Sequence, residues 1–182
     1  GVAVWLGKKY GFPTVCQEAT SPALPVIGYD VPFRRRWDRL RKMAHYIAMA
    51  PYIHDDLVAK GIPEAHVSFL PNGVVVPQNT ADSAAGSGVL YVGNFSQGSE
   101  WKGFDVLVEA WGLVHRRVPE ARLTLVGGGD YSTWEDLAVR QGCRDSMVFA
   151  GRTSTPETYY ASSNIFVLPS RIEGMSNALL EA

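Results

Sequence analysis

From residue 88 onwards, short apolar segments alternate with amphipathic segments of helical period. The apolar segments are 89–92, 123–126, 147–149 and 164–168. Between the segments 89–92 and 123–126, the apolar residues at helical spacing are Phe104, Leu107, Val108, Trp111 and Val114. Their spacing of three and four predicts a helix with one buried face. Because strand–helix–strand repetition requires parallel strands joined by right-handed crossovers, the pattern predicts an α/β domain built around a parallel sheet.

Three further helix starts continue this alternation. Ser132, with Glu135 three residues later, has the form of a capping box. Thr155 followed by Pro156 predicts a helix with proline at its first position, and Ser176 opens a helix behind the segment 164–168. The segment 164–168 has an unbroken apolar centre, which predicts a strand covered on both faces of the sheet.

The chain before residue 78 repeats the alternation less regularly. Strands are predicted over 14–16, 46–50 and 67–70, and helices over 33–44 and 51–60. Residues 78–88 are small and polar and have no apolar period, which indicates a linker. We therefore interpret 1–77 as the closing half of one Rossmann-like domain and 89–182 as a truncated second one. The missing initiator Met and a last residue inside a helix indicate a piece of a longer protein.

Composition narrows the classes of protein to consider. The chain has 182 residues, of which 46% are apolar, and a formal net charge of −1. This charge gives no general attraction to nucleic acid, so no nucleic-acid partner is expected. No apolar stretch approaches the roughly 18 residues of a membrane-spanning helix. The two cysteines, Cys16 and Cys143, lie in different predicted segments, so we expect small core residues in a reducing, cytoplasmic compartment.

The segment 169–182 carries the strongest functional signal. Glu173 follows the predicted strand 164–168, at the carboxyl edge of the sheet, where α/β proteins bind ligands. Glu181 lies about one and a half turns into the helix that Ser176 opens, and helical side chains tilt toward the amino end. Two carboxylates would then flank a helix start whose amides can hold a phosphate. This arrangement suits a sugar nucleotide, which offers hydroxyls to the carboxylates and phosphate to the amides.

This segment resembles the Glu-seven-residues-Glu signature of the family 4 glycosyltransferases, and three further motifs stand in that family's order. They are Asn-Gly-Val at 72–74, Val-Gly-Asn at 92–94 with Lys-Gly-Phe-Asp at 102–105, and Leu-Val-Gly-Gly-Gly-Asp at 125–130. The resemblance implies the GT-B fold, an α/β architecture of two Rossmann-like domains with parallel sheets, both incomplete in this chain. It assigns 1–77 to the acceptor side and 89–182 to the nucleotide-sugar donor side.

The resemblance also implies roles for the residues of the glutamate segment. Glu173 would contact the transferred sugar and Glu181 the ribose of the donor. The backbone amides of Gly174, Met175 and Ser176 would receive the distal phosphate. The plainer alternative is a pair of surface glutamates near a helix start, where negative charge is favourable in any case.

A second group of residues would surround the diphosphate of the donor. Lys102 stands where a loop meets a helix and would contact the diphosphate, as a fixed cation that stabilises the leaving group. The family usually places an assisting Arg at the position of Asn94, next to Gly93, so this chain lacks one charge. Gly127 and Gly128 would let the nucleotide approach the backbone closely, although a glycine-rich turn also forms for packing reasons alone.

Other positions leave alternatives open. Arg152, behind the segment 147–149, would line the base pocket or lie on the surface. Trp101 would border the site or merely pack beside Lys102, which itself has the plain alternative of an exposed lysine at a helix entrance. Ala19 stands where the family often has a His on the acceptor side.

No metal site or cofactor is predicted. The chain has no Asp-x-Asp motif, and the adjacent Asp55 and Asp56 fit the solvated face of a helix. The four histidines show no metal-ligand spacing. We therefore expect a metal-independent mechanism that relies on fixed cations and amides.

The predicted helix 33–44 is basic and amphipathic, with aromatic residues in its apolar stripe. Such a helix can lie on an anionic membrane, as lipid-glycosylating members of the family use their acceptor domain. A helix that packs on its sheet with a solvated basic face is the favoured alternative, because Asp38 interrupts the basic face. The first alternative would place the protein at the inner face of the membrane.

The resulting hypothesis is a metal-independent glycosyltransferase, and the resemblance to the family implies that it is a retaining one. It would move a sugar from a UDP- or GDP-sugar to a glycan or lipid-linked acceptor. Two rivals remain: a nucleotide-sugar epimerase of the same fold, and a nucleotide-sugar binding module that has lost catalysis. Asn94 and Ala19 keep the second rival open.

Overall fold

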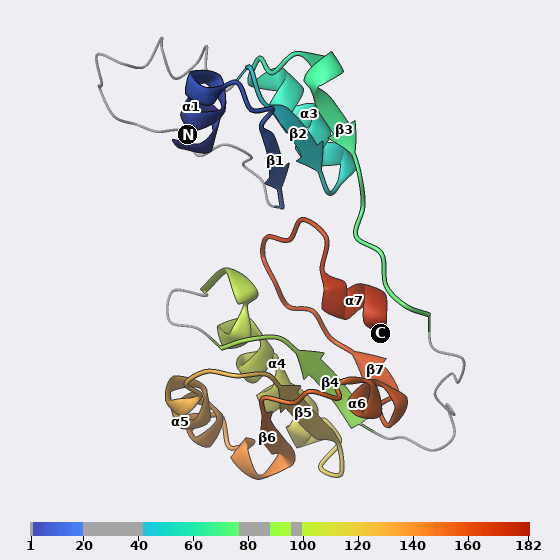
Figure 1. The fold of residues 1–182 in the computed structure, drawn as a ribbon. Helices are drawn as coiled ribbons and strands as arrows, with labels where there is room; N and C mark the ends of the chain where they lie inside the picture. Colours follow the sequence, from blue (N-terminus) through green and yellow to red (C-terminus); the bar gives the residue numbers. More distant parts are fainter. Residues whose placement is uncertain (1, 20–41, 77–87, 96–99) are drawn as a thin grey trace. The chain divides into compact units, whose positions relative to one another are not determined.

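A computed structural model describes residues 2–19, 42–76, 88–95 and 100–182 (Figure 1). The chain divides into two compact units. The first comprises Gly1–Gly73 with the short segment Ile172–Met175, and the second comprises Val74–Arg171 with Ser176–Ala182. Most of the predicted linker 78–88 lies outside the described residues, as do residues 33–41 of the predicted basic helix.

The first unit contains a parallel sheet of three strands in the order β1-β2-β3. Its elements are α1 (Val2–Tyr10), β1 (Val15–Glu18), β2 (His45–Ala48), α3 (Pro51–Ala59), η1 (Glu64–His66) and β3 (Val67–Phe69). Helix α3 buries Ile53 and Leu57 in the same core as Tyr46 of β2. The predicted strands and the helix 51–60 are present, with ends moved by at most two residues, whereas α1 was not predicted.

The second unit contains a parallel sheet of four strands in the order β6-β5-β4-β7 (Figure 1). Its strands are β4 (Gly88–Val92), β5 (Arg122–Val126), β6 (Met147–Gly151) and β7 (Ile165–Phe166). Its helices are η2 (Glu100–Lys102), α4 (Phe104–Arg117), α5 (Ser132–Arg140), η3 (Arg144–Ser146), α6 (Glu157–Ala161) and α7 (Asn177–Glu181). The strand–helix alternation and the parallel pairing that the sequence predicts are confirmed.

The strand order of this sheet contains a reversal. The chain adds β5 and then β6 on one side of β4, and then returns to place β7 on the opposite side of β4. The direction of strand addition therefore reverses at β4, and β4 and β7 are neighbours in the sheet. In open α/β sheets, the crevice at the carboxyl ends of two such strands is where ligands bind.

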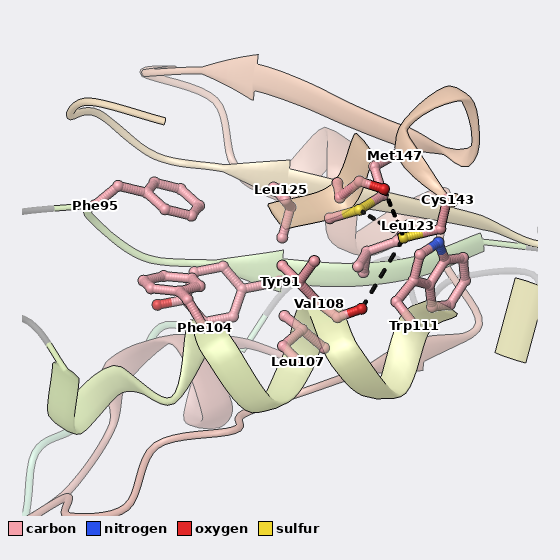
Figure 2. Packing of buried hydrophobic residues seen from close by; sticks show 11 residues of the cluster. Tyr91, Phe95, Phe104, Leu107, Val108, Trp111, Leu123, Leu125, Cys143 and Met147 are labelled. Atoms are coloured by element: carbon pink, nitrogen blue, oxygen red, sulfur yellow. Dashed lines mark hydrogen bonds between the residues drawn. The ribbon is translucent and has the colours of Figure 1, made fainter. Parts of the chain in front are cut away.

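The predicted buried stripe of α4 forms the centre of the second core. Figure 2 shows Phe104, Leu107, Val108 and Trp111 on one face of the helix, against the leucines of β5. Phe104 stacks on Phe95 with ring centroids 4.3 Å apart. The stripe ends before Val114, which is 39% exposed.

A polar link lies inside the same core. The indole N–H of Trp111 donates to the Ser146 hydroxyl at 2.9 Å, and that hydroxyl donates to the Cys143 carbonyl at 2.7 Å. Ser146 is only 1% exposed, so its bonds replace those that water would otherwise make. Cys143 is a free thiol buried beside it, as expected of a core residue, whereas the free thiol Cys16 is only partly buried.

Three local predictions were wrong. Helix α5 begins with Ser132 already inside it and Tyr131 as N-cap, so no capping box forms; Glu135 instead pairs with Arg144 at 2.6 Å. Pro156 is the N-cap of α6 rather than its first residue. Strand β7 is not buried on both faces, because it is the edge strand of the sheet and Ile165 is 56% exposed.

Candidate functional site

The predicted donor-binding residues of the second unit follow the carboxyl ends of its strands. Gly93 and Asn94 come directly after β4, Gly127 and Gly128 after β5, and Arg152 after β6. Parallel strands place these ends at one edge of the sheet. Gly127 N–H donates to the Gly151 carbonyl at 2.8 Å, and Gly93 N–H donates to the Val126 carbonyl at 2.8 Å, so the turns are joined directly.

The turns that follow β4, β5 and β6 contact one another through the residues predicted to bind the donor. The Gly128 N–H donates to the Asn94 Oδ1 at 3.3 Å. A Cβ on Gly128 would lie 3.7 Å from side-chain carbons of Arg152, so the arginine covers this glycine. Gly127 has a φ of 151°, and a Cβ there would lie 2.6 Å from the carbonyl carbon of Gly93, so a side chain at this position would part the two turns. The structure thus brings all five residues together.

Lys102 ends the short helix η2, and one residue separates it from the start of α4. Its Nζ lies 4.0 Å from the centroid of the Trp101 ring, a cation–π contact that holds the ammonium group beside the turn. Gly103 follows with a φ of 70°, the left-handed conformation, and is the N-cap of α4. A Cβ on Gly103 would lie 2.9 Å from the carbonyl carbon of Pro169. The Lys102 turn therefore touches the backbone of the loop that follows β7.

Arg171 fastens these two loops to each other. Its guanidinium donates from Nη1 to Asp105 Oδ1 at 2.9 Å and from Nη2 to Asp105 Oδ2 at 2.6 Å. Its backbone N–H donates to the Trp101 carbonyl at 2.7 Å. The hydrogen bonds from Arg171 hold the pKa of the Asp105 carboxyl below its ordinary value. The two loops at the switch point, after β4 and after β7, are therefore joined by side-chain and backbone bonds.

Glu181 lies at the end of α7, where its side chain is exposed. Ser176 is the N-cap of this helix, as predicted, and its hydroxyl accepts from the Leu179 N–H at 3.3 Å. The Tyr160 hydroxyl of α6 donates to Glu181 Oε2 at 3.1 Å. Burial of the Tyr160 phenol raises its pKa, and the hydrogen bond and negative charge of Glu181 raise it further.

Glu173, Gly174 and Met175 are grouped with the first unit, whereas Lys102, Ser176 and Glu181 belong to the second. In the first unit, the Tyr52 hydroxyl donates a hydrogen bond to the backbone carbonyl of Glu173. A Cβ on Gly174 would collide with the Ala19 carbonyl oxygen, so this position has no room for a side chain.

Sequence reasoning missed Tyr160 and Arg171 as residues of this site. Asp105 was noted only as part of a motif. Their partners are 21 and 66 residues away along the chain, so no local period or spacing indicates the contacts. Among the residues that the structure describes, no group of three or more His, Cys, Asp or Glu side chains could hold a metal ion. None of the described helices is long and apolar enough to cross a membrane.

A parallel sheet joined by helical crossovers, with glycine-rich turns at the carboxyl ends of its strands, defines a Rossmann-like unit. Residues 86–182 match the model of the family described as glycosyl transferases group 1, and the chain belongs to that family. The match covers the whole second sheet and every residue discussed at its edge.

Proteins of similar sequence support the same assignment. An uncharacterised glycosyltransferase of Haemophilus influenzae is 31% identical over 117 residues, which are 64% of this chain and 32% of that protein. A GDP-mannose-dependent alpha-(1-6)-phosphatidylinositol monomannoside mannosyltransferase of Mycobacterium tuberculosis is 32% identical over 139 residues, covering 66% of this chain and 36% of that protein. The chain therefore spans about a third of the length of these relatives.

Solved structures show the same fold. S. aureus TarM superposes with a TM-score of 0.74 at 15% identity, over 95% of this chain and 35% of that one. Anabaena HepE, in complex with UDP and glucose, superposes with a TM-score of 0.68 at 17% identity, over 93% of this chain and 49% of that one. These likenesses confirm the α/β fold of GT-B type that the sequence predicts.

Proposed function

We propose that the whole protein is a retaining, metal-independent hexosyltransferase that uses a UDP- or GDP-sugar and a glycan or lipid-linked acceptor. The observation that carries this proposal is the pair of joined loops at the switch point of the second sheet. They hold Lys102 beside the start of α4 and lead into the glutamate segment. Family membership supports glycosyl transfer, and the mannosyltransferase relative uses GDP-mannose according to its name.

The proposed chemistry starts with the departing diphosphate. Negative charge grows on its oxygen as the sugar bond breaks, and fixed positive groups stabilise that charge most in the transition state. Lys102 supplies an ammonium group, and the backbone amides of Gly174, Met175 and Ser176 would hold the distal phosphate. Asn94, where the family usually has an Arg, contributes an amide dipole whose oxygen already accepts from Gly128. Lys102 would therefore carry a larger share of the stabilisation.

The rest of the donor would follow the sheet edge. The Gly127 and Gly128 turn, beside Gly93, has no side chains and lets a nucleotide approach the backbone. Arg152 covers this turn and would line the base pocket. Glu181 would accept from the ribose hydroxyls.

The remaining assignments concern the sugar and the acceptor. Glu173 would hydrogen-bond the transferred sugar. The proposal keeps the predicted division, with 1–77 as the acceptor side, 78–88 as a linker and 89–182 as the donor side. The protein would act in the cytoplasm. If its acceptor is lipid-linked, the helix 33–44 would contact the inner face of the membrane. The mannosyltransferase relative is named for a phosphatidylinositol-based substrate, which supports a lipid-linked acceptor.

The test is a full-length protein incubated with a panel of labelled UDP- and GDP-sugars, with and without a chelator. Transfer of label that persists in the chelator, with retained anomeric configuration by NMR, is the expected result. Lys102→Ala should lower kcat about 100-fold or more while changing nucleotide affinity little. Lys60→Ala is the control, because Lys60 is the C-cap of α3 in the first unit, outside the second sheet, and pairs there with Asp56.

Three outcomes would refute parts of the proposal. Activity lost in the chelator and restored by a divalent metal would exclude metal independence. Conversion of the donor into an epimer without transfer would establish the epimerase instead. Nucleotide-sugar binding with neither reaction, across a broad acceptor panel, would leave a binding module.

A further inference from the structure

Glu181 is the only charged residue of helix α7 (Asn177–Glu181). Its carboxylate accepts a hydrogen bond from Tyr160, which belongs to another helix of the same unit. Tyr160 projects from α6, and its ring packs against Phe166 of β7 with centroids 5.9 Å apart. Its hydroxyl donates to Glu181 Oε2 at 3.1 Å across 21 residues of sequence. Tyr160 is half-buried and packs against a strand, whereas Glu181 is exposed. The hydrogen bond therefore restrains an exposed carboxylate from a fixed position on the sheet.

This contact changes what the carboxylate can do. A free glutamate side chain samples many rotamers, and fixing it when a ligand arrives lowers affinity. The hydrogen bond from Tyr160 limits that freedom beforehand. It occupies one acceptor position on Oε2, and an ionised carboxylate has further lone pairs on both oxygens for other donors.

The phenol remains a donor over the working range of pH. Burial and the neighbouring carboxylate both raise the pKa of Tyr160, so the hydroxyl keeps its proton. The direction of the hydrogen bond is therefore constant, from the tyrosine to the glutamate.

We propose that Tyr160 is a positioning residue that orients the Glu181 carboxylate to accept hydrogen bonds from the two ribose hydroxyls of the donor nucleotide. This inference rests on the proposed nucleotide-sugar function. Tyr160 acts through Glu181, so its contribution depends on both the carboxylate and the ribose hydroxyls. A tyrosine that only packed α6 against β7 would show neither dependence.

The experiment measures the affinity of the full-length protein for UDP, GDP and their 2′,3′-dideoxy forms by calorimetry. Tyr160→Phe keeps the ring and removes the donor, and it should weaken binding of the better-bound nucleotide about tenfold. Its effect on the dideoxy form should be less than twofold. The matched control is Tyr159→Phe, at the preceding position of α6, which should leave both affinities unchanged.

A double-mutant cycle with Glu181→Gln makes the coupling measurable. If Tyr160 acts through the carboxylate, its substitution should have little further effect in the Glu181→Gln background. Equal weakening of the ribose and dideoxy forms by Tyr160→Phe, or full additivity with Glu181→Gln, would overturn the inference. Unchanged affinity in Tyr160→Phe would also overturn it.

The same data separate failure of the inference from failure of the function proposed above. If Glu181→Gln weakens nucleotide binding but Tyr160→Phe does not, only the role of Tyr160 is wrong. If neither the wild-type protein nor its variants bind UDP or GDP, the nucleotide-sugar function fails together with the inference. Thermal unfolding of each variant shows that the compared proteins are folded.

Discussion

Replacing Gly103 by alanine tests the close contact between the Lys102 turn and the loop after β7. The residue has a φ of 70°, and alanine in this left-handed conformation costs about 1–2 kcal/mol. The new Cβ would also lie 2.9 Å from the Pro169 carbonyl carbon, so the two backbones must move apart. Such overpacking typically adds about 1–3 kcal/mol, which gives an expected loss of about 2–5 kcal/mol in the free energy of unfolding.

Gly142→Ala provides the matched control. Gly142 has almost the same φ, 69°, but a Cβ there meets nothing within 4 Å. It should therefore cost only the conformational term of about 1–2 kcal/mol. The difference between the two variants isolates the contact with Pro169.

Urea unfolding measures both variants, and hydrogen–deuterium exchange of the α4 and β4 peptides reports the second unit specifically. Gly103→Ala should also increase exchange in the loop around Pro169, whereas Gly142→Ala should not. Equal losses of stability in the two variants would refute the close approach of the loops.

Three further predictions concern the second unit. Ser146→Ala should lower the free energy of unfolding by about 1–3 kcal/mol in urea titrations, because the buried indole N–H of Trp111 loses its acceptor. Leu123→Ala should lower it by about 2–5 kcal/mol in the same assay, since Leu123 is 0% exposed and β5 lies inside the sheet; a smaller loss would mean that the core repacks. Above the ordinary carboxyl pKa, which is about 4, the ion pair between Asp105 and Arg171 should stabilise the fold only slightly, because both side chains are nearly half exposed. As the pKa of Asp105 is lowered in the folded state, this contribution should disappear as pH falls through that lowered value, and Asp105→Asn should have no such pH dependence.

The periodic part of the fold was predictable from sequence. The stripe on α4 and the apolar segments of the second sheet repeat over several turns or strands, so many residues agree on one interpretation. The capping box at Ser132 failed because a cap depends on the conformation of a single residue. Glu135 has a stronger partner in Arg144, which lies nine residues further along the chain.

The candidate site was predicted in part for the same reason. Gly93, Asn94, Gly127, Gly128 and Arg152 each follow a strand, and parallel strands bring such positions to one edge. The sequence could therefore indicate their meeting before the structure showed it. Tyr160 and Arg171 follow no such rule, because their partners depend on how α6, α7 and the loops pack in three dimensions.

At the switch point, the side-chain ion pair and the backbone contacts differ in how firmly they hold the two loops together. The ion pair of Arg171 with Asp105 is nearly half exposed, so water and salt weaken it and its removal alone should cost little stability. The backbone contacts are less adjustable: Arg171 N–H bonds the Trp101 carbonyl at 2.7 Å, and Gly103 admits Pro169 only because it lacks a side chain. The position of Lys102 relative to the loop after β7 therefore depends mainly on the backbone. It follows that Arg171→Lys, which keeps the charge and the backbone bond but loses the bidentate geometry, should disturb this position less than Gly103→Ala does.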